Sequence, residues 1–254
     1  MYTPPCFLAP LPPTLEDMHV HSTFSDGKSS VAENVDEAIA LGLHRICCVD
    51  HVRVDTPWVP DFVRAVRVQA RRASGLRLEV CVGVEAKILD ESGALDMPPR
   101  DPGVDFVLVA DHQFPVGDRF LSPSAVRRGI AEGTLRADRL IEGLVRATRN
   151  AVERHDRVIV AHLFSILPKV GLDEGQVRDS QIADLAFCVA QRGALVEVSE
   201  KWGCPSPRVV RALRAVGAGI LASTDSHARH TIGRYSPATL STLALRPRDV
   251  DVAV

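Results

Sequence analysis

Nine side chains that commonly bind metal ions follow short apolar runs in this sequence, each close to the point where a run ends. They are six histidines, two aspartates and one glutamate, namely His19, His21, Asp26, His51, Glu85, His112, His162, Asp225 and His227. Taken alone, a histidine after a strand is more often structural, and an aspartate there is more often a helix N-cap. Imidazole and carboxylate together suit zinc, manganese or iron, and a carboxylate can bridge two ions. The set predicts a hydrolase with a cluster of about two to three divalent metal ions.

The sequence context separates the candidate ligands from the other three histidines. His19 and His21 are separated by one residue, so an extended backbone directs both rings to one side. By contrast, His44 lies between a helical pattern and the next apolar run, and His155 follows a long helical pattern. We expect both to be structural, the latter with an imidazole that suits the helix dipole. His230 follows the last cluster and is a candidate for substrate contact or proton transfer.

The elements that must position these residues alternate along the chain. Seven apolar runs, rich in valine and isoleucine, read as strands buried on both faces of a parallel sheet. They cover Leu15–His21, Arg45–Asp50, Leu76–Glu85, Val104–Asp111, Arg157–Ala161, Ala194–Ser199 and Ala218–Thr224. Helical patterns separate most of them, over Val31–Leu41, Phe62–Ser74, Ser122–Glu132, Arg136–Glu153, Ser180–Arg192 and Pro207–Val216. Glycine follows four of these patterns, as expected of helix ends.

This alternation predicts an α/β fold in which seven strands form a closed or nearly closed TIM-like barrel. The alternative is an open doubly wound sheet. Chemistry in such barrels is located at the carboxyl ends of the strands. All nine candidate ligands follow strands, so they would meet on one rim, and this convergence outweighs the structural interpretation of each residue alone.

Length and composition limit the other possibilities. The chain has 254 residues, 46% of them hydrophobic, which suits a single barrel domain over residues 15–254 after a proline-rich lead-in at 1–14. A net charge of −2 does not favour nucleic acid as a partner. No apolar run has the length of a bilayer span, and the N-terminus lacks a signal-peptide pattern. Six cysteines without a CxxC pair suggest buried thiols in the cytoplasm. The oligomeric state is left open.

The ordered motifs resemble those of the PHP family, named for polymerase and histidinol phosphatase domains. Asp17–Gly27 (DMHVHSTFSDG) is similar to the first motif of that family. Val49–His51, Gly83–Glu85, His112, His162 and Asp225–His227 are similar to the motifs that follow, in the same order. The resemblance extends from about residue 15 to residue 235. It implies a distorted seven-stranded barrel that usually holds three metal ions.

The resemblance also implies how the ligands divide. One ion would be held by His19, His21, Glu85 and Asp225. A second would be held by Glu85, His112 and His162, with Glu85 bridging the two. The third would be held by Asp26, His51 and His227.

Such a centre would hydrolyse its substrate without a covalent nucleophile. Two ions that share Glu85 would also bridge a water and lower its pKa from about 16 toward neutrality. Asp225 is the second carboxylate to which we assign a catalytic role. We expect the resulting hydroxide to attack a phosphoester held by the cluster. Cationic side chains near the rim would bind the phosphate. Lys201 is the preferred candidate because it follows its strand most closely, and Lys169 and Arg229 are the others.

The leading prediction is a phosphatase acting on a small phosphorylated metabolite. The first alternative is a nuclease or phosphodiesterase. The second is an amidohydrolase-like enzyme that cleaves C–N or C–O bonds, although the fourth strand lacks the lysine that several such enzymes carboxylate. A structural module is disfavoured because every ligand is retained. The segment 119–139 is expected to form a lid or part of the substrate pocket.

Overall fold

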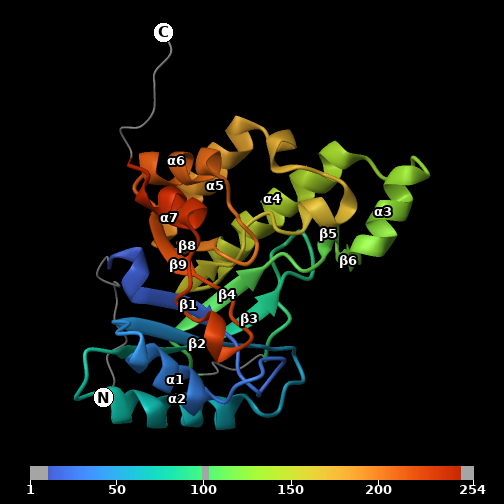
Figure 1. The fold of residues 1–254 in the computed structure, drawn as a ribbon. Helices are drawn as coiled ribbons and strands as arrows, with labels where there is room; N and C mark the ends of the chain where they lie inside the picture. Colours follow the sequence, from blue (N-terminus) through green and yellow to red (C-terminus); the bar gives the residue numbers. More distant parts are fainter. Residues whose placement is uncertain (1–10, 99–102, 247–254) are drawn as a thin grey trace.

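A single parallel sheet organises the chain in the computed structural model, which describes residues 11–98 and 103–246. Its strands are β1 (Glu16–Val20), β2 (Arg45–His51), β3 (Glu79–Lys87), β4 (Phe106–Ala110), β7 (Val158–Val160), β8 (Leu195–Ser199) and β9 (Gly219–Ser223). They adjoin in that order. A parallel bridge between Val20 and Ser226 brings the end of β1 beside the chain that leaves β9. The sheet is therefore a nearly closed barrel, as predicted (Figure 1).

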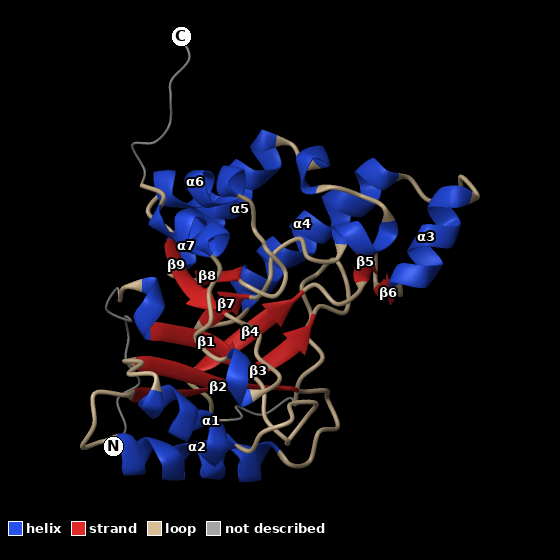
Figure 2. Ribbon diagram, in the orientation of Figure 1, coloured by secondary structure: helices blue, strands red, loops and turns tan. Residues whose placement is uncertain are grey.

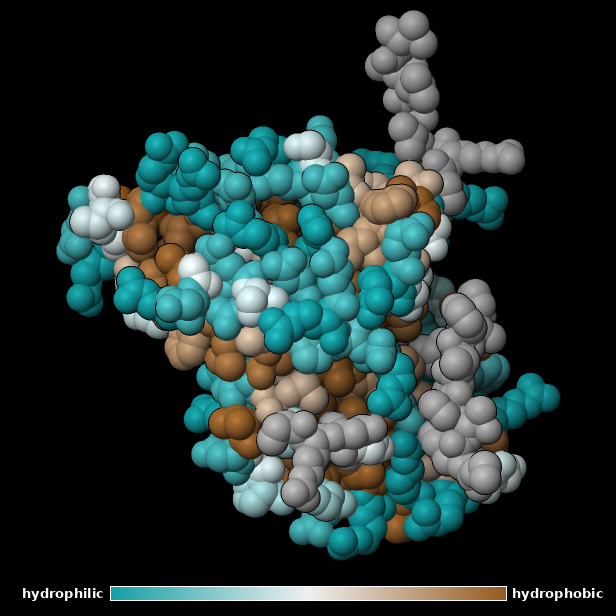
Figure 3. Space-filling view, turned by 180° about the vertical axis from the view of Figure 1, so that it is seen from behind, coloured by the Kyte–Doolittle hydropathy of each residue, from teal (hydrophilic) through white to brown (hydrophobic). Residues whose placement is uncertain are grey.

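Helices cover the outside of this barrel in two groups (Figure 2). One group is α1 (Val31–Ala40) and α2 (Val59–Ala73), which pack against β2 and β3. The other comprises α4 (Ala137–Arg154), α5 (Asp179–Arg192), α6 (Pro207–Ala215) and α7 (Pro237–Ala244), on the side of β7 to β9. Hydrophilic side chains cover much of the helical surface seen from behind (Figure 3). No helix of the described residues has the length and apolar character needed to cross a bilayer.

The irregular parts of the fold lie around β4. The connection from β3 to β4 contains no α-helix among the described residues. After β4 the chain forms an antiparallel hairpin, β5 (Phe114–Val116) and β6 (Arg119–Leu121), followed by α3 (Pro123–Ala131). The sequence pattern predicted all seven barrel strands and six of the helices, but it missed this hairpin and α7.

The barrel interior is filled by small and branched apolar side chains beneath the rim. They include Met18, Cys47, Val49, Cys81, Leu108, Ile159 and Leu221. A Cβ atom at Gly83 would lie only 3.0 Å from Leu108 Cδ1, so glycine allows the close packing just below Glu85. The five described cysteines are free and buried, which confirms their reading as small apolar residues. Cys6 and the first ten residues of the predicted lead-in lie outside the described residues.

Candidate metal centre

His19 lies on β1 and His21 directly follows that strand, which is irregular at this point. The register between β1 and β2 shifts between Asp17 and Val20, as it does at a β-bulge. His19 and His21 are both buried, with ring centroids 4.8 Å apart. Asn34 on α1 donates a hydrogen bond to the carbonyl of His21 at 2.8 Å and holds the end of the strand. The one-residue spacing of the two histidines thus supplies two adjacent imidazoles to one site.

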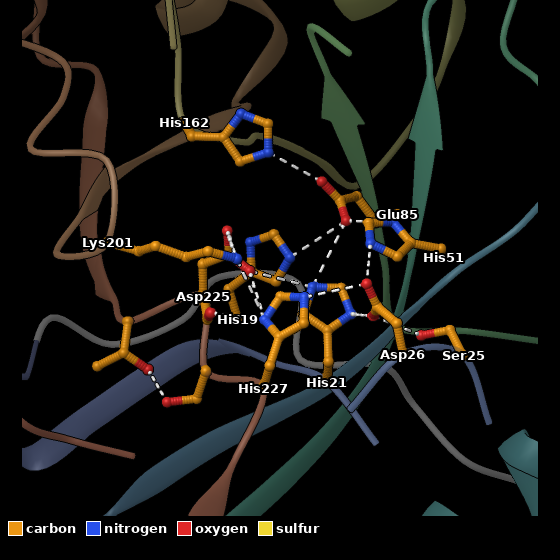
Figure 4. Close-up of polar contacts among 12 residues, drawn as sticks. His19, His21, Ser25, Asp26, His51, Glu85, His162, Lys201, Asp225 and His227 are labelled. Carbon is orange, nitrogen blue, oxygen red and sulfur yellow. Dashed lines mark hydrogen bonds and ion pairs between the residues drawn. The ribbon is translucent and has the colours of Figure 1, made fainter. Parts of the chain in front are cut away.

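Glu85 occupies the middle of the rim (Figure 4). Its Oε1 lies 3.1 Å from His112 Nε2 and 2.9 Å from His162 Nε2. Its Oε2 lies 2.7 Å from His51 Nδ1 and about 3.5 Å from His19 Nε2. The two oxygens therefore face different sets of imidazoles, which is the arrangement expected of a bridging carboxylate.

A second carboxylate, Asp26, lies close to His21, His51 and His227. Asp26 Oδ2 lies 3.5 Å from His51 Nε2 and 3.3 Å from His227 Nε2. The ligand atoms of His21, Asp26, His51 and His227 all lie within 4.8 Å of one another. Two further groups of this kind are His19, His21 and Glu85, and His51, Glu85 and His112.

Left-handed backbone presents two of the candidate ligands. His162 has φ of 28° and Asp225 has φ of 51°, values that cost residues other than glycine about 1–3 kcal/mol. Asp225 Oδ1 lies 3.2 Å from His21 Nε2. Its Oδ2 accepts a hydrogen bond from Trp202 Nε1 at 2.6 Å and lies 3.1 Å from Lys201 Nζ. Strained backbone of this kind is typical of functional sites.

The protein satisfies these buried polar atoms incompletely. Of the eleven buried side-chain atoms without a hydrogen-bond partner in the described residues, five lie at this site: His19 Nε2, His21 Nδ1, His21 Nε2, Glu85 Oε2 and Asp225 Oδ1. Each belongs to a ligand predicted from the sequence. Leaving such atoms without partners in the interior is costly, and a divalent cation would satisfy them together. The nitrogen and oxygen donors therefore fit metal ions.

Electrostatics keep the central carboxylates ionised. Burial alone would raise the pKa of Glu85, but the charges of His112 and His19 outweigh it and hold that pKa well below the usual range. Burial lowers the pKa of His162, yet hydrogen bonds with Asp111 and Glu85 raise it overall, to about 10. Burial lowers the pKa of His21 to about 4. Bound metal would compete with the protons on these imidazoles.

Glu197 was not anticipated from the sequence, although it contacts two of the candidate ligands. It lies in the barrel interior on β8 and is 0% exposed. Its Oε2 accepts a hydrogen bond from His19 Nδ1 at 3.0 Å, and its Oε1 accepts one from the His162 backbone N–H at 2.7 Å. A carboxylate bound to Nδ1 leaves the Nε2 lone pair of His19 directed at the centre. The sequence feature that could have indicated Glu197 is a single acidic residue between the valines of Leu195–Ser199 (LVEVS).

Aspartates that precede rim histidines hold the neighbouring loops. Asp111 Oδ1 lies 3.2 Å from His162 Nδ1 and accepts a hydrogen bond from Ser165 Oγ. Asp50 accepts hydrogen bonds from Ser22 and Ser25, in the loop that carries Asp26. Their repeated position directly before a rim histidine could have indicated this role.

A cavity of about 440 Å³ opens above the centre. Its lining includes four basic side chains, Arg53, Lys87, Lys169 and Lys201, together with Gln113 and Trp202. Arg229 and His230 are exposed on the turn η4 (Arg229–Thr231) and do not belong to this lining. Arg229 lies near Glu33 instead: hydrogen bonds with Ser30 lower the pKa of that carboxyl, and the charge of Arg229 adds to the lowering.

The segment 119–139 flanks two of these lysines. Lys87 Nζ lies 5.4 Å from the ring centroid of Phe120, and Arg127 donates a hydrogen bond to the carbonyl of Lys169 at 2.5 Å. The hairpin and α3 thus contact two lysines of the cavity without contributing to its lining, and a lid role stays a prediction.

The two histidines expected to be structural lie away from the rim. His44 immediately precedes β2, at the opposite end of that strand from His51, and His155 follows α4. Burial and the neighbouring Arg154 lower the pKa of His155, so its imidazole is neutral near pH 7 rather than partly positive.

Comparison with known proteins supports the chemistry that this site suggests. The family model described as the PHP domain matches residues 17–198. A protein of Caldanaerobacter subterraneus subsp. tengcongensis named as a probable phosphatase is 26% identical over 87% of this chain and 80% of its own length. Another, from Vibrio parahaemolyticus, is 30% identical over 48% of this chain and 50% of its own. The structure of histidinol phosphate phosphatase from Lactococcus lactis, complexed with zinc, L-histidinol and phosphate, matches with a TM-score of 0.63. It is 16% identical over 91% of each chain and supports the fold.

Barrel and site together define a metal-dependent hydrolase. The chain belongs to the PHP domain family and is a metal-dependent phosphoesterase of that family.

Proposed function

We propose that this protein is a phosphatase that hydrolyses a small phosphorylated metabolite at a centre of three divalent ions. The observation that carries the proposal is the position of Glu85, whose two oxygens face separate imidazole groups at the floor of a cavity lined by lysines. His19, His21, Glu85 and Asp225 would hold one ion, and Glu85, His112 and His162 the second. Asp26, His51 and His227 would hold the third.

Bound divalent ions would supply Lewis acidity and activate water for attack on phosphorus. The side chains of the chain itself position this chemistry. Glu197 and Asp111 hydrogen-bond Nδ1 of His19 and His162, so Nε2 of each ring is directed at Glu85. Glu85 and Asp225 remain anionic because neighbouring imidazoles lower the pKa of both carboxyl groups. We assign the catalytic role to these two carboxylates.

Lys201 and Lys169 are placed to bind the phosphoryl oxygens. Lys201 Nζ lies 3.2 Å from His227 Nδ1, beside the proposed third ion. Lys169 Nζ lies 4.1 Å from the ring centroid of Trp202, so the indole supports this ammonium at the edge of the cavity. Ammonium groups at these positions would bind the negative oxygens of a phosphoester.

The size of the cavity favours a small substrate. Its volume of about 440 Å³ lies within the range of small-molecule sites, about 300–1,000 Å³. The net charge of −2 offers no broad basic surface for a nucleic acid. The relatives named as phosphatases and the histidinol phosphate phosphatase of similar fold point in the same direction.

A hydrolysis screen of the metal-loaded protein tests the proposal, with inorganic phosphate measured for the monoesters, p-nitrophenol for the diester and the released amine for the amides. The panel should contain phosphomonoesters, bis(p-nitrophenyl) phosphate as a model diester, and simple amides. Turnover of monoesters is expected, and it should disappear in Glu85→Gln. Cleavage of the diester or of amides, with monoesters left intact, would retain the metal site but refute the phosphatase assignment.

A further inference from the structure

The distribution of lysine in this chain is uneven. Of the 30 basic residues only four are lysines, at positions 28, 87, 169 and 201, and the others are arginines. Three of the four line the cavity above the candidate metal centre. Many arginines lie on the outer helices, whereas three of the four lysines lie at the cavity. Lysine carries a compact point charge on a flexible side chain. This concentration favours an anionic ligand in the cavity.

The basic side chains of the cavity fall into two groups on different sides of the rim. Lys169 and Lys201 follow β7 and β8, whereas Arg53 follows β2 and Lys87 ends β3. The strand order places β4 between β3 and β7, and β1 and β9 between β2 and β8. A phosphoryl group beside Lys201 therefore leaves the second group, Arg53 and Lys87, for another part of the substrate.

The second group is held together by Asp96. Lys87 Nζ lies 3.1 Å from Asp96 Oδ2, while Asp96 Oδ1 accepts a hydrogen bond from the backbone N–H of Val54 at 2.8 Å. These contacts tie the loop that carries Arg53 to the end of β3. Asp96 offsets the charge of Lys87, but Arg53 has no ion-pair partner among the residues that the structure describes. Its guanidinium is thus the cation available to a ligand.

Gln113, in the loop between β4 and β5, adds a polar group to the same side of the cavity. Gln113 lines the cavity, and its Oε1 is buried with no hydrogen-bond partner among the described residues. An amide can rotate to offer a donor to an anionic oxygen, as the Arg53 guanidinium does in bidentate form.

We propose that Arg53 and Lys87 form a second anion-binding subsite, and that the substrate carries a carboxylate or second phosphate besides the phosphoryl group that is cleaved. This inference rests on the proposed phosphatase function and specifies its substrate class. A leaving group without charge would gain nothing from the Arg53 guanidinium, whereas a second anion would pair with it, beside the Lys87 ammonium that Asp96 already offsets. Lys201 and Lys169 then serve the reacting phosphoryl group, and Arg53 determines specificity.

Matched substrates test this subsite. In the first pair, 3-phosphoglycerate has a carboxylate where glycerol 3-phosphate has a hydroxymethyl group. In the second pair, fructose 1,6-bisphosphate has one phosphate more than fructose 6-phosphate. We expect the doubly anionic member of at least one pair to have a kcat/KM about tenfold higher. The pair that shows this preference identifies the second anion as carboxylate or phosphate. Arg53→Gln should remove the preference and leave turnover of the singly phosphorylated member unchanged, with metal content intact.

Two controls separate the possible failures. Arg64→Gln removes an exposed arginine of α2 that pairs with Asp61, and it should alter neither substrate. Binding of phosphonoacetate and methylphosphonate, measured by calorimetry, gives the same comparison without turnover, and Arg53→Gln should weaken only the former. Equal kcat/KM within both pairs, or an equal loss on both members in Arg53→Gln, would refute the subsite while preserving the phosphatase. Absence of turnover on every monoester would refute the proposed function itself.

Discussion

The two ends of the barrel bury charged side chains in different ways. At the lower end, Arg45 donates hydrogen bonds to Glu16 and Glu79, each at 2.9 Å. At the rim, Glu85 and Asp225 face imidazoles, and several of the buried atoms between them have no hydrogen-bond partner of acceptable geometry in the described chain. At the lower end, Glu16 is thus neutralised by Arg45 of the same chain. At the rim, Glu85 is placed to bind metal ions instead.

This difference separates stability from function within one sheet. A complete ion pair holds strands together but offers no free ligand atoms. An incomplete cluster destabilises the protein until a cation satisfies it, and so it is suited to bind metal. Substitutions at the two ends should therefore change different measured quantities.

The largest effect is expected from Glu85→Ala. Loss of the carboxylate that faces both imidazole groups should remove bound metal and lower kcat by about three orders of magnitude, or about 4 kcal/mol. Elemental analysis and phosphate release measure the two quantities. Glu79→Gln, at the lower end, should leave both unchanged. Full metal content in Glu85→Ala would exclude Glu85 from the cluster.

At the lower end, Arg45→Met should act on stability alone. It leaves Glu16 buried without its cation, and breaking a buried pair in this way costs about 3–5 kcal/mol. Urea unfolding should show that loss in the free energy of unfolding, with metal stoichiometry unchanged. A loss of metal comparable to that of Glu85→Ala would mean that the two ends are not independent.

A smaller effect is expected from Glu197→Gln. The carboxylate accepts hydrogen bonds from both His19 and His162, but an amide has only one acceptor oxygen and must present a donor to one of them. Metal affinity should fall about 10–100-fold, as measured by competition with a chelator. Glu200→Gln is the matched control, because Glu200 accepts hydrogen bonds from Ser236. Equal affinity in the two variants would remove Glu197 from the support of the centre.

The smallest effect is expected from Lys201→Ala. Removal of one ammonium from the phosphate side of the cavity should raise KM for phosphomonoesters about tenfold, or about 1.4 kcal/mol, with metal content intact. Steady-state kinetics on a simple monoester measures the change. A parallel loss of metal would show that Lys201 stabilises Asp225 rather than the substrate.

Much of this comparison could be predicted from the sequence. Runs of valine and isoleucine located the seven strands, and the rule that barrels carry chemistry at strand ends gathered the nine rim residues. What could not be predicted depends on tertiary geometry. The bulge in β1 and the left-handed backbone at His162 and Asp225 leave no local signal. The inward direction of Glu197 and the outward position of His230 are set by how the sheet closes and how the last loop turns.

Metal stoichiometry is the most direct test of the central claim that the rim is a metal centre. The protein should be loaded with zinc or manganese, desalted, and analysed by elemental analysis beside Glu85→Ala. The account predicts up to three equivalents per chain, as the proposed centre of three ions requires, and a clear loss in the variant. Protein that retains no metal under these conditions, or a variant that retains as much as the unmodified chain, would contradict it.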